Sequence, residues 1–115
     1  MSEPSKSNLP IFSQLMEVLF QRKSDLPGNS YTTTLFLAGK SKISAKVFEE
    51  CTELIDAFTE EKDKKSVIHE TADLFYHVFV LLTDCGVSLN DIEAELVRRF
   101  GISGLEEKAA RNQQE

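Results

Sequence analysis

The chain has 115 residues, of which 41% are apolar and 28% are charged, and its net charge is −6. This composition is typical of one globular domain and excludes an intrinsically disordered chain. The negative charge argues against nucleic acid as a partner, and an anionic substrate such as a nucleotide would need a divalent cation as a bridge.

The first nine residues are polar, and we expect residues 1–9 to form a flexible tail ahead of a single α-helical domain at residues 10–115. The longest apolar run, LFYHVFVLL, is too short to span a membrane, so we expect a cytoplasmic protein with no membrane partner. Cys51 and Cys85 lack a metal-binding spacing and are expected to be buried and reduced.

The first predicted helix begins at Pro10, because proline suits the first turn of a helix. Apolar residues then recur at four-residue spacing, which indicates an amphipathic helix: Ile11, Leu15, Leu19 and Phe12, Met16, Phe20. The stretch DLPGNS ends it. A short helix is predicted over residues 31–38, with Ser30 as its N-cap and Gly39 at its end. The threonines of YTTTLFLA would also suit a strand, and we favour the helix.

Two long helices follow, over roughly residues 41–61 and 66–84. In the first, four apolar residues lie within about 60° on a helical wheel and predict the core face: Ile43, Val47, Leu54 and Phe58. The second is apolar nearly all round, which predicts burial on most sides and, in so small a chain, a second copy over its outer face. The short charged turn between them predicts antiparallel neighbours.

Ser88 and Asp91 predict the start of a further helix through a capping box, and Gly101 ends it. Its apolar face consists of Leu89, Ile92, Leu96, Val97 and Phe100. Residues 103–115 are expected to form a last short helix or a tail. The predicted fold is therefore all-α, an antiparallel bundle of four to five helices that assembles as a dimer.

Both long helices carry acids beside their apolar faces. On the first, Glu50 and Glu53 lie about 60° apart, with Lys46 between them, while Glu49 lies about 100° from Glu50. On the second, Glu70 and Asp73 lie about 60° apart, with His77 between them. If the helices are antiparallel neighbours, the two acid pairs meet.

Four carboxylates beside a core must be protonated, paired with bases or bound to a metal ion. Lys46 and His77 are too few to pair with them, so we predict that Mg²⁺, or Mn²⁺ in its place, is bound by Glu50, Glu53, Glu70 and Asp73. A solvated acidic strip with pairs such as Lys46–Glu50 is the plainer alternative. A di-iron centre is disfavoured because it needs histidines at the positions of Glu53 and Asp73.

KVFEECTEL followed by HETAD resembles the E-E-x-x-E … E-x-x-D signature of the all-α, MazG-like nucleoside triphosphate pyrophosphohydrolases. The stretches GNSYTTTLFLAGKSKISAKVFEE, ADLFYHVFVLLTDCGVSL and SGLEEKAARN narrow the resemblance to the phosphoribosyl-ATP pyrophosphohydrolase family, over nearly all of the chain after residue 9. The resemblance implies Mg²⁺-dependent hydrolysis of 1-(5-phosphoribosyl)-ATP to 1-(5-phosphoribosyl)-AMP and pyrophosphate, the second step of histidine biosynthesis, by a helical homodimer. Phe48 stands where the family usually has a small residue, and because it points away from the acids we expect altered packing rather than lost activity.

Within this resemblance, Glu49 orients or deprotonates the attacking water, or is simply a solvent-facing acid. Lys46 neutralises phosphate charge or pairs with Glu50. Ser30, Tyr31 and Thr32 match the SYT of the family and are expected to bind the substrate. Further phosphate candidates are Arg22, Lys40, Lys42, Arg98, Lys108 and Arg111. His77 either donates a hydrogen bond behind the metal ligands or, as we favour, is a core residue.

Two other functions are compatible with the sequence. A house-cleaning pyrophosphatase acting on (d)NTPs would use the same acids. A non-catalytic dimeric helical adaptor would carry them only as metal or solvent ligands.

Overall fold

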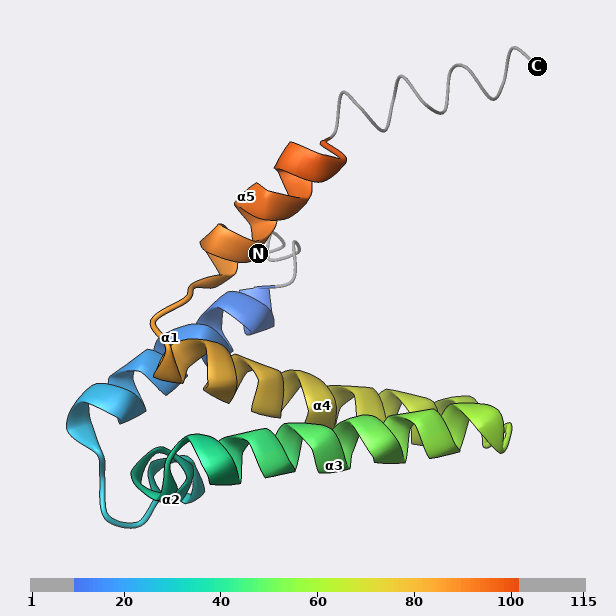
Figure 1. The fold of residues 1–115 in the computed structure, drawn as a ribbon, viewed down its shortest axis with the longest axis horizontal. Helices are drawn as coiled ribbons and strands as arrows, with labels where there is room; N and C mark the ends of the chain where they lie inside the picture. The colour runs from blue at the N-terminus through green and yellow to red at the C-terminus, as the bar shows by residue number, and fades with distance from the viewer. Residues whose placement is uncertain (1–9, 102–115) are drawn as a thin grey trace, which may run out of the picture.

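The computed structural model describes residues 10–101, which form five helices and no strand (Figure 1). They are α1 (Pro10–Asp25), α2 (Tyr31–Ala38), α3 (Lys40–Thr59), α4 (Lys64–Asp84) and α5 (Leu89–Arg99). The predicted all-α bundle is confirmed, and the two long helices begin and end within two residues of their predicted bounds. The tail expected at residues 1–9 and the segment at residues 103–115 lie outside the described residues.

Local side-chain chemistry explains where these helices begin. The hydroxyl of Ser30 accepts a hydrogen bond from the backbone N–H of Thr33, 3.3 Å away, at the start of α2. Ser88 and Asp91 form the predicted capping box at the start of α5. Asp63 caps α4 in the same way as Ser30 caps α2. Gly39 joins α2 to α3 at a φ of 93°, a conformation that favours glycine.

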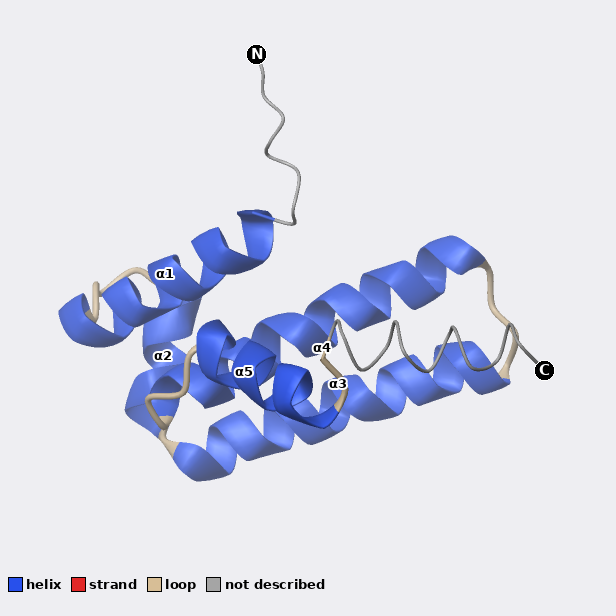
Figure 2. Ribbon diagram, turned by 90° about the horizontal axis from the view of Figure 1, so that it is seen from above, coloured by secondary structure: helices blue, strands red, loops and turns tan. Residues whose placement is uncertain are grey.

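The α3–α4 hairpin, residues 40–84, is the longest feature of the molecule. Its two antiparallel helices form the most extensive helix pair of the fold and are joined by the charged turn at residues 60–63. Figure 2 shows that α1 and α2 pack beside the hairpin at the end away from this turn. The other half of the hairpin extends past them toward the turn.

The core lies where α1 and α2 pack against the hairpin. Its buried apolar members are Met16, Leu19, Leu35, Phe36, Ile43, Phe79 and Val80. The ring of Phe12 meets those of Phe75 and Phe79 edge to face, with 5.8 Å between centroids in each pair. Asp84, at the end of α4, lies 2.8 Å from the ammonium of Lys23 in α1 and 3.4 Å from that of Lys40 in α3.

Three expectations about burial are wrong for the single chain. Phe58 is 73% exposed, because the half of α3 that carries it extends beyond α1 and α2. No residue of α5 is buried, although its apolar face has the predicted pattern, because α5 projects away from the bundle. Cys85 is exposed, since it follows the last residue of α4, whereas Cys51 is partly buried.

None of the five described helices alone has the length and apolar character needed to cross a membrane, although α4 and α5, which meet at a bend of 102°, meet those two conditions as a pair.

Candidate metal centre

The two acid-bearing stretches face each other across the α3–α4 hairpin. Glu50 and Glu53 come from α3, and Glu70 comes from α4. The i,i+3 spacing of Glu50 and Glu53 puts both on one side of their helix. One carboxylate oxygen from each of the three residues lies within 4.8 Å of the others. The structure thus brings Glu70 beside Glu50 and Glu53, although it comes about twenty positions after Glu50 in the sequence and lies on a different helix.

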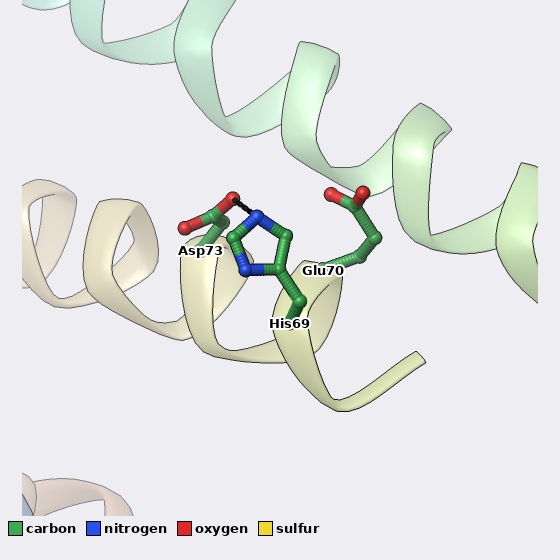
Figure 3. A group of neighbouring side chains, drawn as sticks. All are labelled: His69, Glu70 and Asp73. Carbon is green, nitrogen blue, oxygen red and sulfur yellow. Dashed lines mark ion pairs between the residues drawn. The ribbon is translucent and has the colours of Figure 1, made fainter. Parts of the chain in front are cut away.

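Asp73 joins these acids through Glu70. Oxygens of Glu70 and Asp73 lie within 4.8 Å of each other and of a ring nitrogen of His69, on the same helix (Figure 3). Glu70 therefore belongs to two adjoining groups, one with Glu50 and Glu53 and the other with His69 and Asp73. All four acids singled out by the sequence lie in one continuous cluster.

Glu50 is the buried member of the cluster. Its exposed fraction is only 6%, and its Oε1 atom has no hydrogen-bond partner among the described residues. The buried Oε1 atom of Glu70 also has none within that part of the chain. Burial raises the pKa of the Glu50 carboxyl above its ordinary value, and the nearby carboxylates of Glu53 and Asp73 raise it further. Buried acceptors without donors are costly, and a bound cation would satisfy them.

Lys46 supplies part of the opposing charge. Its ammonium lies 3.7 Å from Oε2 of Glu50 and 3.3 Å from Oε1 of Glu49. The hydrogen bond with Glu49 raises the pKa of Lys46, so this side chain stays charged at neutral pH. This one ammonium is shared by two carboxylates, and neither Glu53 nor Glu70 has an ion pair among the described residues. Hard carboxylate oxygens in this number fit a Mg²⁺ or Mn²⁺ ion.

Glu49 stands apart from the four clustered acids, as the helical wheel predicts. Its side chain is 53% exposed, and its recorded partner is Lys46, one turn earlier on α3. The plain ion pair and a role at the edge of the site are both compatible with this position. Phe48 is 76% exposed and lies on the side of α3 away from Glu50, the direction that the helical wheel predicts.

A polar cleft of about 440 Å³ lies where α1 leads into α2. It is lined by Arg22, Pro27, Asn29, Ser30, Tyr31 and Thr32. The guanidinium of Arg22 donates a hydrogen bond to the Ser30 hydroxyl at 3.1 Å. The three predicted substrate-binding residues of α2 and its N-cap therefore line one cleft together with Arg22, one of the further phosphate candidates.

His77 connects this cleft with the acids. Its Nδ1 lies 2.9 Å from the backbone carbonyl of Asp73, and its Nε2 lies 3.3 Å from the hydroxyl of Tyr31. Because a carbonyl only accepts, Nδ1 carries the hydrogen, and in the neutral ring Nε2 accepts from Tyr31. His77 is 7% exposed, which agrees with the favoured expectation of a core histidine. Thr32 is also buried, and its hydroxyl is hydrogen-bonded to that of Tyr76.

The remaining basic candidates are not gathered at one place. Lys42 is exposed and forms no ion pair within residues 10–101. Lys40 pairs with Asp84, and Arg98 pairs with Glu95. Lys108 and Arg111 lie outside the described residues.

Two side chains beside these sites were not predicted. Asn29 lines the polar cleft, and His69 adjoins the acids. The sequence does contain a signal for His69, since it precedes Asp73 by four residues, a spacing that puts two helical side chains on the same face.

Comparison with known proteins identifies the family of the chain. A family model described as phosphoribosyl-ATP pyrophosphohydrolase matches residues 12–100. The chain is 42% identical to the phosphoribosyl-ATP pyrophosphatase of Methylococcus capsulatus, over 90% of this chain and 97% of that protein. It is 46% identical to the protein of the same name from Geobacter sulfurreducens, over 90% and 94% of the two chains. With the namesake from Rhodopirellula baltica it shares 44% identity, over 92% and 89%. The chain belongs to the phosphoribosyl-ATP pyrophosphohydrolase family.

Proposed function

We propose that this chain hydrolyses 1-(5-phosphoribosyl)-ATP to 1-(5-phosphoribosyl)-AMP and pyrophosphate, the second step of histidine biosynthesis. Beside its family membership, one observation carries the proposal: Glu50 is buried among other carboxylates with an oxygen that has no partner within the described chain. Such a residue is costly to a merely structural helix pair and useful to a site that holds a divalent cation, whose charge would neutralise a polyphosphate.

Glu50, Glu53, Glu70 and Asp73 would hold the divalent cation, with Mg²⁺ as the expected ion and Mn²⁺ as a substitute. Such an ion supplies Lewis-acid stabilisation of the charge on the triphosphate oxygens. The buried carboxylate of Glu50 fixes the inner edge of the site, and the two helices hold the four acids in register without a flexible loop.

Glu49 and Lys46 are the proposed catalytic residues. The carboxylate of Glu49 orients a water molecule and accepts its proton as it attacks the phosphorus whose cleavage releases pyrophosphate. Lys46 holds Glu49 in place at 3.3 Å and keeps a positive charge beside the reacting phosphates.

The polar cleft beside α2 is the proposed site for the phosphoribosyl end of the substrate. Arg22, Ser30, Tyr31 and Thr32 line it, and the guanidinium and hydroxyls are suited to phosphate and ribose oxygens. Lys42, which is exposed on α3, is proposed to contact a phosphate group of the substrate.

The test uses the purified full chain, phosphoribosyl-ATP and Mg²⁺, with pyrophosphate release as the measurement. EDTA should abolish the release and added Mg²⁺ should restore it. Glu50→Gln and Asp73→Asn should each lower kcat by at least about 100-fold, because each removes a ligand charge. Glu60→Gln, which changes an exposed acid in the hairpin turn, is the matched control and should keep full activity. Near-full turnover by either ligand variant would contradict the assignment.

A substrate panel separates this proposal from a house-cleaning function. A preference for dNTPs over phosphoribosyl-ATP in kcat/KM would favour the house-cleaning enzyme. Metal binding without turnover of any triphosphate would favour the adaptor.

We also propose that the chain functions as a cytoplasmic homodimer. The support is apolar surface on the α3–α4 hairpin, where large side chains are 41–76% exposed: Phe48, Ile55, Phe58, Ile68 and Phe75. Part of it borders an apolar cleft of about 300 Å³, formed with Phe12, Val67, Thr71 and Ala72. A second copy of the same hairpin would cover this surface with matching apolar side chains.

A further inference from the structure

Tyr31 lies between the polar cleft and the acid cluster. Its side chain is 52% exposed and lines the cleft together with Arg22 and Ser30. Partial burial raises the pKa of the Tyr31 hydroxyl above its usual value of 10.0, and the charges of Lys46 and Glu50 act on it in opposite senses. The hydroxyl is therefore uncharged at pH 7 and carries one hydrogen.

Two consecutive hydrogen bonds determine where that hydrogen points. The backbone carbonyl of Asp73 can only accept, so Nδ1 of His77, 2.9 Å away, donates to it. In the neutral ring Nε2 then offers a lone pair, and it accepts the hydrogen of the Tyr31 hydroxyl at 3.3 Å. His77 is only 7% exposed, and the ring of Tyr76 packs edge to face against it with 4.9 Å between centroids, so the imidazole is held in this orientation.

The oxygen of Tyr31 is therefore left with lone pairs alone for any molecule in the cleft. A phosphate oxygen is an acceptor, and it could bond to this hydroxyl only if the bond to His77 were broken. A sugar hydroxyl can donate to it while the bond to His77 stays intact. The hydrogen-bonding partner that suits Tyr31 is thus a hydroxyl and not a phosphate.

The neighbouring side chains complete a site for a sugar phosphate. The guanidinium of Arg22 is held by its hydrogen bond to the Ser30 hydroxyl at 3.1 Å, and its other N–H groups remain for a phosphate. Tyr31 lines the same cleft, so a sugar that carries the phosphate can place a hydroxyl at the Tyr31 oxygen.

We propose that Tyr31 accepts a hydrogen bond from a ribose hydroxyl of the substrate, and that His77 is a positioning residue that keeps the Tyr31 hydroxyl an acceptor. This inference rests on the proposed function, because it names the group of phosphoribosyl-ATP that the cleft recognises. The substrate contains two riboses, one in the ATP part and one in the phosphoribosyl part, and the kinetic test below distinguishes them.

The hydrogen-bond arrangement is tested by nuclear magnetic resonance of the full chain with ¹⁵N-labelled histidines at pH 7. The only other histidine is His69, so the variant His69→Gln assigns the signals. We expect the ring hydrogen of His77 on Nδ1 and none on Nε2. Tyr31→Phe should move the Nε2 resonance and leave that of Nδ1 in place. A hydrogen on Nε2 would overturn the inference and leave the proposed function standing.

The ribose contact is tested by kcat/KM for phosphoribosyl-ATP and for four analogues, each lacking the 2′- or the 3′-hydroxyl of one ribose. For the wild type we expect one analogue to be about tenfold poorer than the parent, chiefly through KM. Tyr31→Phe, a change at a half-exposed residue, should remove this difference. His77→Asn can still donate to the carbonyl of Asp73 but is too short to reach Tyr31, and should reduce the difference to less than about threefold.

Thr83→Val is the matched control, because it changes another buried polar residue of α4 whose hydroxyl has no hydrogen-bond partner among residues 10–101. It should keep the full difference between the analogue and the parent. A difference that survives in Tyr31→Phe would overturn the contact, and so would a wild type that treats all four analogues like the parent. If the wild type does not hydrolyse phosphoribosyl-ATP at all, the proposed function fails and this inference fails with it.

Discussion

Glu50 is an ionisable side chain that the fold buries at a cost when no cation is present. Replacing it by Gln removes the charge while keeping the shape, so Glu50→Gln should raise the free energy of unfolding of the metal-free protein by about 1 kcal/mol at pH 7. The same variant should lose the stabilisation that Mg²⁺ gives the wild type, about 2.7 kcal/mol at 100 times the dissociation constant. Urea unfolding with EDTA and with Mg²⁺ measures both.

The stability cost of burying Glu50 in the metal-free protein depends on pH, and the sign of that dependence follows from its pKa. Because the pKa of Glu50 is raised on folding, the folded chain binds its proton more tightly than the unfolded chain does. The stability of the metal-free wild type therefore falls as pH rises from the ordinary carboxyl value, 4.5, through the raised one. The advantage of Glu50→Gln should grow over the same interval. An advantage that is constant with pH would mean that the charge of Glu50 is not its source.

Thr32 has a structural role in addition to its proposed role in substrate binding. Its buried hydroxyl is hydrogen-bonded to that of Tyr76, which joins α2 to α4. Thr32→Val and Tyr76→Phe should each cost about 1 kcal/mol of stability, and the double variant should cost about 1 kcal/mol less than their sum. Thermal unfolding of the four proteins measures this coupling. Additive losses would exclude the hydrogen bond as the cause.

At the residue scale, the caps were predictable from the sequence because they depend on nearby residues alone. Ser30, Ser88 and Asp91 act on backbone groups within three positions. The contact of His77 with Tyr31 spans 46 positions, so it requires the packing of α2 against α4. No local pattern contains that information.

At the scale of elements, Asp84 connects three helices near the base of the hairpin. Its hydrogen bond from Lys23 and its ion pair with the more exposed Lys40 lower its pKa. Asp84→Asn should therefore cost about 1 kcal/mol of stability at pH 7, after allowance for the partly exposed lysines.

The stability that Asp84 contributes depends on pH in the opposite sense to the stability cost of burying Glu50. A depressed pKa contributes stability above the ordinary value of 3.8, and this contribution disappears as pH falls through the lowered value. Urea unfolding should show the wild type and the variant converging only below about pH 3.8. Glu95→Gln is the control for this comparison. It also removes an ion-paired carboxylate, but that carboxylate is exposed and its partners lie on its own helix, so it joins no two helices.

The helical wheel predicted the faces of α3 correctly and their burial only in part. Ile43 and Glu50 are buried on the predicted side, whereas Phe58 on the same side is exposed. A wheel gives the direction of a side chain and contains no information about which elements reach that far along the helix. The same reason applies to α5, whose apolar face is well formed and, apart from Leu89, exposed in the described chain.

At the scale of the whole molecule, the uncovered half of the hairpin predicts self-association. Phe58→Ser should shift the full chain from dimer toward monomer in light scattering, because it removes apolar area from the proposed interface. Val18→Ser changes an exposed apolar residue on α1 and should leave the dimer intact. A wild type that remains monomeric at micromolar concentration would contradict the dimer.

The shape of the hairpin also determines how the protein opens locally. Its two helices are fastened by the core at one end and by the turn at residues 60–63 at the other, and the acid cluster lies between these ends. A cation bound by both Glu53 and Glu70 would link α3 to α4 and would limit local unfolding of the two helices from the turn. In hydrogen exchange, the amides between the acid cluster and the turn should exchange more slowly when Mg²⁺ is added, while the amides in the core keep their exchange rates. The acid cluster would then mark the boundary between the turn end of the hairpin, which opens locally, and the end held in the core, which does not.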